Sequence, residues 1–233
     1  MAERVISTWR DPYDEGFSTC RLKQITVKSG LTVLVGCNGA GKTTLLHNIQ
    51  SELTKENIPC YLFDNLHDGG ATAKSMAAFE EDWAFLATSV ASSEGENINM
   101  NIGILAKKLK EFMISGRIGD RFTRIGDAFA RFAGEKEYET SETKERWLLL
   151  DAIDSGFSID NIVETKDFFK MVIKDFADYG YELYIVASAN EYELANGEDC
   201  FDVMNGKYIR FENYDDFKTF ILRSREKKDK RYK

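Results

Sequence analysis

Nine consecutive residues, Gly36 to Thr44, have the types and spacing needed to bind phosphate: Gly-Cys-Asn-Gly-Ala-Gly-Lys-Thr-Thr. They fit the pattern G-x-x-x-x-G-K-[ST], in which a glycine-rich loop turns its backbone N–H groups onto phosphate oxygens. In this pattern the ammonium of Lys42 reaches the β- and γ-phosphates, and the hydroxyl of Thr43 binds Mg²⁺. The pattern predicts that a nucleoside triphosphate binds at the following residues: Asn38, Gly39, Ala40, Gly41, Lys42, Thr43 and Thr44.

The segments on either side of the loop predict the structure that such a loop requires. Residues 31–35 form an apolar, β-branched run typical of a buried strand, and residues 45–49 have the character of the first turns of a helix. A helix N-terminus adds free N–H groups and the positive end of its dipole to an anion site. A chance match in a glycine-rich turn is the alternative, and the order strand, loop, helix argues against it.

Two acidic residues that could bind a metal or take part in catalysis lie at and just after the end of the apolar strand expected at residues 147–151. Asp151 ends this strand, where its carboxylate is placed to hold Mg²⁺ through water, opposite Thr43. Asp154 follows three residues later, and Lys42 of the loop is a candidate catalytic residue. We therefore expect Thr43 and Asp151 to form a metal site, with Mg²⁺ and ATP as the bound groups.

The rest of the chain predicts an α/β fold with a mostly parallel core sheet flanked by helices and an N-terminal antiparallel portion. A hairpin with an Asn-Gly turn is expected over residues 201–211. A helical lobe of about residues 70–146 is inserted between two core parts, about 1–65 and 147–233, of a single domain spanning 1–233. The other expected elements are strands at residues 4–9, 21–28, 60–63 and 181–187 and helices at residues 73–90, 98–114, 163–179 and 214–225.

The composition of the 233 residues, 43% hydrophobic and 30% charged, is typical of a soluble globular protein. The sequence has no apolar run long enough to span a bilayer, and its N-terminus lacks the apolar region of a signal peptide. The four cysteines are scattered, which favours a reducing cytoplasm over disulfides or a structural zinc site.

The charge is distributed unevenly along the chain. The net charge of −8 argues against nonspecific nucleic-acid binding by the whole surface. The last eleven residues, Arg223 to Lys233, nevertheless carry seven Lys or Arg against two acids. This tail is expected to be a frayed, solvated helix end, or alternatively a contact for nucleic acid or a partner protein.

Taken in order, these motifs resemble the ATP-binding cassette (ABC) ATPase family, and the resemblance covers most of the chain. Residues 92–96, Ser-Ser-Glu-Gly-Glu, look like the family's signature motif, Leu-Ser-Gly-Gly-Gln/Glu, although a helix capping box would also explain the Ser and the last Glu. Residues 148–151 look like the Walker B strand, and residues 154–158 look like the D-loop that follows it. The loop at residues 64–68 takes the position of the Q-loop.

The resemblance implies a homodimer in which two domains pair head to tail, so that each signature caps the ATP held by the other. Ser93 and the Gly95 backbone would then contact the γ-phosphate in trans, and Glu96 is the last residue of this trans signature. The Glu of the signature is closer to the heads of chromosome-maintenance and DNA-repair ATPases, and the chain is also similar to small stand-alone bacterial and phage ATPases. An ATP-gated dimerising switch is therefore implied, with DNA transactions or phage–host conflict as its setting.

Three positions depart from the family pattern. Ala152 stands where the family places the catalytic Glu that polarises the attacking water, and alanine cannot accept a proton. The Q-loop position lacks Gln, and residues 188–190, Ser-Ala-Asn, replace the switch His. Loss of a general base typically slows a reaction by about 10²–10⁴-fold. We therefore expect slow turnover unless Asp154, Asp64 or His67 takes that role.

Three other functions stay open at this point. A transporter's nucleotide-binding subunit would need a membrane partner and a complete Q-loop. A small-molecule kinase would need an arginine-rich lid, for which the candidates are Arg117, Arg121, Arg124 and Arg131. A non-hydrolysing ATP sensor that reports to a partner protein is favoured by Ala152.

Overall fold

The computed structural model describes residues 2–8, 22–64, 109, 112–116, 143–155 and 157–231. Its centre is a six-stranded sheet in the order β4-β5-β6-β3-β7-β8, in which β8 runs antiparallel to β7 and the other pairs are parallel. The predicted α/β class with a mostly parallel sheet is therefore confirmed. The strands are β3 (Gly30–Val35), β4 (Cys60–Asp64), β5 (Glu145–Asp151), β6 (Glu182–Ser188), β7 (Cys200–Asp202) and β8 (Lys207–Ile209).

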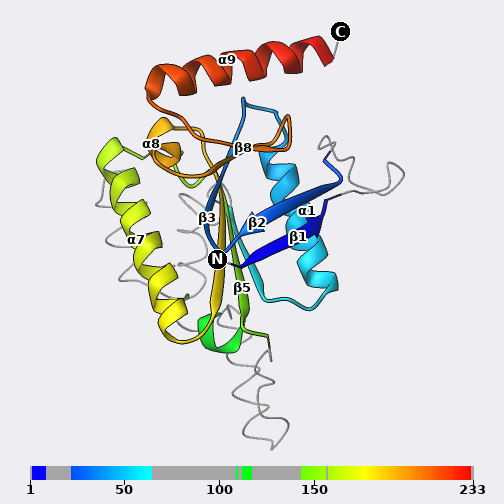
Figure 1. Ribbon diagram of the computed structural model, residues 1–233, viewed down its shortest axis with the longest axis vertical. Coiled ribbons are helices and arrows are strands. Elements are labelled where there is room, and N and C mark those ends of the chain that lie inside the picture. The colour runs from blue at the N-terminus through cyan, green and yellow to red at the C-terminus, as the bar shows by residue number, and fades with distance from the viewer. Residues whose placement is uncertain are drawn as a thin grey trace, which may run out of the picture.

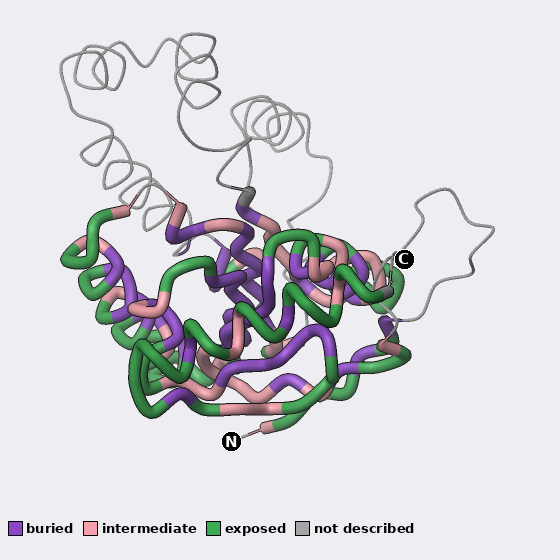
Figure 2. The backbone as a smooth tube through the Cα atoms, turned by 90° about the horizontal axis from the view of Figure 1, so that it is seen from above, coloured by how far each residue is buried: buried purple, intermediate pink, exposed green. Residues whose placement is uncertain are grey.

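Both faces of this sheet are buried, as a parallel sheet requires. Side chains alternate along β5, so that Trp147 belongs to one apolar cluster and its neighbour Leu148 to the other. Helix α1 (Lys42–Lys55) packs into the Trp147 cluster and α7 (Ile159–Asp178) into the Leu148 cluster. Figure 1 shows the two helices on opposite sides of the sheet, and Figure 2 shows the buried backbone running through the centre.

A separate two-stranded antiparallel sheet, β1 (Glu3–Ser7) and β2 (Gln24–Lys28), covers part of the α1 side. Its apolar residues join the same cluster as α1, which explains why these short strands form away from the main sheet. The predicted N-terminal antiparallel portion is thereby confirmed. The sequence also offers Trp9, Tyr13 and Phe17 as candidates for stacking on a nucleotide base, and all three lie outside the described residues.

The predicted hairpin near the C-terminus is formed by β7 and β8, but its connection is longer than a two-residue Asn-Gly turn. Asp202 pairs with Lys207, which leaves four residues between the strands. The Asp202 carboxylate accepts hydrogen bonds from the backbone N–H groups of Met204 (2.8 Å) and Asn205 (3.3 Å). An aspartate that bonds to the backbone two residues on stabilises such a turn, and this local bonding sets the loop length.

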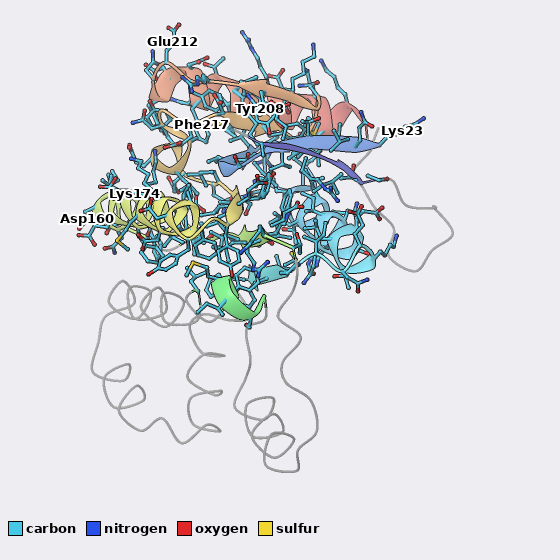
Figure 3. All side chains as sticks on the ribbon, turned by 60° about the horizontal axis from the view of Figure 1, so that its bottom comes forward. Lys23, Asp160, Lys174, Tyr208, Glu212 and Phe217 are labelled. Atoms are coloured by element: carbon cyan, nitrogen blue, oxygen red, sulfur yellow. The ribbon has the colours of Figure 1, made fainter. Side chains whose placement is uncertain are left out.

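The C-terminal helix α9 (Tyr214–Arg231) is longer than predicted, and its basic end is helical as far as Arg231. Phe217 is buried and lies 5.1 Å, centroid to centroid, from Phe211 and 5.7 Å from Tyr192. Figure 3 shows Phe217 within the fold, whereas Glu212, just before the helix, lies at its periphery. The aromatic contacts fix the first half of α9 across the end of the sheet, where Figure 1 shows the helix.

The expected helical lobe of about residues 70–146 falls largely outside the described residues. The strand that follows it, β5, begins at Glu145, two residues before the strand expected at residues 147–151. Within the lobe, residues 112–115 are helical, and Phe112 and Met113 pack into the α7-side cluster. Among the described residues, no helix has the length and apolar character needed to cross a lipid bilayer.

Candidate phosphate-binding site

The carboxyl ends of β3, β5 and β6 bring the predicted site residues to one edge of the sheet. Leu34 of β3 pairs with Ser188 of β6, and the N–H of Ala189 donates to the Leu34 carbonyl at 3.0 Å. Asp151 at the end of β5 accepts a hydrogen bond from the Ser188 hydroxyl. Ligands of open α/β sheets bind outside the carboxyl ends of the strands, so this edge is where a site is expected.

Residues 36–41, hereafter the glycine-rich loop, lead from β3 directly into α1. Gly39 (φ 75°) and Gly41 (φ 100°) have left-handed backbone conformations, which glycine adopts without the steric cost of a Cβ. Gly41 is the N-cap of α1, and the first helical hydrogen bond runs from the N–H of Leu45 to its carbonyl at 2.9 Å. The N–H groups of the first helical residues, Lys42 to Thr44, therefore lie at the helix start, where they can receive an anion.

The side chain of Lys42 turns back over this loop. Its Nζ donates to the Gly36 carbonyl at 2.8 Å, and the residue is only 9% exposed. Burial lowers the pKa of the Lys42 ammonium, whereas the nearby carboxylates of Asp154 and Asp151 act in the opposite direction. The loop thus holds the Lys42 ammonium close to its own backbone, in a position largely shielded from solvent.

Ser188 fixes the carboxylate of Asp151. Its hydroxyl donates to Asp151 Oδ1 at 2.7 Å and accepts the N–H of Ala152 at 2.7 Å. Asp151 is itself only 9% exposed, while Thr43 at the start of α1 is exposed. A carboxylate and a hydroxyl are oxygen ligands of the kind that Mg²⁺ prefers, so the donor types of Asp151 and Thr43 suit that metal.

Ala152, in the position where a catalytic Glu was expected, has a left-handed backbone with φ 51°. This conformation costs a residue with a Cβ roughly 1–2 kcal/mol. The hydrogen bond from its N–H to Ser188 helps to hold the conformation.

Replacing Ala152 with glycine should raise the free energy of unfolding by about 0.5–1 kcal/mol, since glycine removes the strain at some cost in chain entropy. Urea unfolding measures the change. Ala177→Gly in the exposed part of α7 is the matched control and should destabilise by up to about 1 kcal/mol. If both variants lose stability to the same extent, the left-handed strain at Ala152 is refuted.

The candidate catalytic residue Asp154 is buried, and its carboxylate is hydrogen-bonded to residues that follow β6. It is 1% exposed, and its carboxylate accepts the N–H groups of Asn190 (2.6 Å) and Glu191 (2.7 Å) and the side-chain amide of Asn190 (3.3 Å). Burial raises the pKa of Asp154, and the backbone N–H donors oppose that shift. These bonds tie the segment after β5 to the start of α8 (Tyr192–Ala195), a short helix that the sequence did not predict.

The three residues of the expected signature, Ser93, Gly95 and Glu96, lie outside the described residues. His67, one of the alternative general bases, does so as well. Asp64 ends β4, where its backbone pairs with Asp151. The described part of the site therefore consists of the glycine-rich loop, the start of α1 and the ends of β5 and β6.

Two residues of α9 that the sequence did not single out also reach the glycine-rich loop. Ser224 Oγ accepts the N–H of Cys37 at 3.2 Å, and Lys228 Nζ donates to the Asn38 carbonyl at 2.9 Å. The basic tail was the only signal for them, and it does not reveal which residues face the loop. The carboxyl end of β3 is therefore contacted by elements far apart in the sequence.

Comparison with known proteins gives no family assignment. No protein-family model matches the chain, and a search of curated proteins finds no match.

Proposed function

We propose that the chain binds Mg²⁺–ATP at the glycine-rich loop and belongs to the ABC type of ATPase that its motifs resemble. The observation that carries the proposal is the buried Lys42 ammonium, which lies over a loop with left-handed Gly39 and Gly41 and at the start of a helix. A compact cation, a glycine-rich turn and a helix N-terminus together match the charge and shape of a polyphosphate.

The same proposal assigns Mg²⁺ to Thr43 and Asp151. The bound ion would neutralise charge on the β- and γ-phosphates. Ser188 is the positioning residue for this pair, because its hydrogen bond orients the Asp151 carboxylate. The free thiols of Cys37, Cys60 and Cys200 support a reducing compartment such as the cytoplasm.

We further propose that ATP gates a head-to-tail homodimer and that turnover is slow. The support is the resemblance of the motifs and the methyl side chain of Ala152, which cannot activate water. A protein partner or DNA would recognise the ATP-bound state. A role in DNA transactions or phage–host conflict follows from the same resemblance.

A second candidate, a non-hydrolysing ATP sensor, is favoured by the bonds of Asp154. Its carboxylate already accepts three N–H donors and is 1% exposed, so it has little access to an attacking water. The two candidates share the binding site and differ only in whether the γ-phosphate is cleaved.

Steady-state Mg²⁺–ATP hydrolysis, measured against protein concentration, separates the two candidates. A rate that rises more than linearly with protein supports the dimeric ATPase. ATP binding without turnover above the Lys42→Ala background supports the sensor. Failure of the wild-type protein to bind ATP at all would overturn both.

A further inference from the structure

The glycine-rich loop contacts the last turns of α9 through two bonds one helical turn apart. Ser224 is 4% exposed, and its Oγ accepts the Cys37 N–H at 3.2 Å. Lys228 follows four residues later, so the two side chains share one face of the helix. Its Nζ donates to the Asn38 carbonyl at 2.9 Å. Ser224 thus anchors the helix to the loop and brings the Lys228 ammonium to the exposed loop residues Asn38 and Gly39.

The loop is shaped so that this ammonium can come close. Asn38 and Gly39 are both exposed, and a Cβ built on Gly39 would lie 3.3 Å from Lys228 Nζ. The absence of a side chain at Gly39 keeps that approach open. Two lysines from separate elements therefore reach the loop's backbone, Lys42 at the Gly36 carbonyl and Lys228 at the Asn38 carbonyl.

The charge of the helix end supports an anionic ligand at this position. The chain has a net charge of −8, yet residues 223–233 carry seven Lys or Arg against two acids. Figure 1 shows α9 lying across the end of the sheet at which β3 gives way to the loop. The basic side chains at the C-terminal end of α9 therefore add to the field of the α1 N-terminus, and both attract a polyanion.

We propose that Lys228 is a second phosphate-binding lysine, delivered to the glycine-rich loop by α9. This inference rests on the proposed binding of ATP and extends it to a residue outside the loop motif. A lysine ammonium has three N–H donors, and the structure describes one acceptor for Lys228, a neutral carbonyl. A phosphate oxygen is a stronger acceptor because the hydrogen bond is then charge-assisted on both sides. When a nucleoside polyphosphate binds, the Lys228 ammonium exchanges its hydrogen bond to the Asn38 carbonyl for one to a phosphate oxygen.

The test is the equilibrium dissociation constant of Mg²⁺–ATP for the full chain and for Lys228→Gln, measured by calorimetry. The expected result is a loss of affinity of roughly tenfold, in the range for one charge-assisted hydrogen bond. Lys227→Gln is the matched control, because Lys227 has the same charge on the next residue and bonds instead to the Asn205 side chain. It should change the affinity by less than about twofold.

Two further measurements separate a phosphate contact from a merely structural tether. Lys228→Arg should restore most of the affinity, and the melting temperature without ligand should be the same in Lys228→Gln and Lys227→Gln. If wild-type protein binds ATP and Lys228→Gln binds it as tightly as Lys227→Gln does, this inference is overturned while the proposed function stands. If wild-type protein binds no ATP, both are overturned.

Discussion

Lys42→Ala is expected to weaken Mg²⁺–ATP binding by roughly 100-fold or more, because one ammonium would contact two phosphate groups. The Lys42 side chain is already turned over the loop by its bond to the Gly36 carbonyl, so little ordering is needed on binding. Calorimetry or displacement of a fluorescent nucleotide measures the affinity. The effect is the largest that we expect from a single side chain on ligand binding.

The matched control for Lys42 is Lys55→Ala, at the opposite end of the same helix. Lys55 is exposed and forms an i,i+3 ion pair with Glu52, so its loss should leave ATP affinity within about twofold. The free energy of unfolding should stay close to wild type in Lys42→Ala, because burying the ammonium is unfavourable and its removal relieves that cost. Equal ATP affinities in the two variants would refute the role of Lys42.

Arg146→Leu is expected to lower the free energy of unfolding by about 3 kcal/mol, since a charged hydrogen-bond network is lost in the core. Arg146 is 0% exposed. Its Nε donates to the carbonyls of Phe112 (3.2 Å) and Met113 (3.1 Å), and its Nη1 donates to those of Thr143 (2.6 Å) and Glu145 (2.9 Å). Leucine fills most of the volume but leaves these carbonyls without this donor. Urea unfolding measures the loss.

Lys144→Leu gives the comparison for Arg146, because both cations lie over the same aromatic ring. Lys144 Nζ is 4.6 Å and Arg146 Cζ 4.8 Å from the ring centroid of Tyr181. Lys144 is exposed, so its loss should cost less than about 1 kcal/mol. A similar cost for both variants would show that the buried carbonyl contacts of Arg146 contribute little.

The fold around the loop was predictable because its signals are local. A β-branched run, a glycine-rich loop and an amphipathic segment lie within about 25 residues and fix β3, the loop and α1. The strand at residues 147–151 was recognisable from its unbroken apolar run, and the structure extends it by the two residues Glu145 and Arg146. Arg146 misled the prediction because a buried arginine is rare and resembles a surface residue in the sequence.

The bonds that complete the site were not predictable because they join distant parts of the chain. Ser224 meets Cys37 across 187 residues, and Lys228 meets Asn38 across 190. The periodicity of apolar residues within a helix does not indicate which of its turns will contact a loop so distant in the sequence. The same holds for Asp154, whose acceptor role depends on the N–H groups of Asn190 and Glu191 at the end of another strand.

The most direct test of the account is an equilibrium titration of the wild-type chain with ATP, ADP and AMP in the presence of Mg²⁺. Because the proposed contacts are to the β- and γ-phosphates, ATP and ADP should bind and AMP should bind at least about 100-fold more weakly. Binding of ATP that is no tighter than binding of AMP, or no binding at all, would contradict the assignment of the glycine-rich loop as a nucleotide phosphate site.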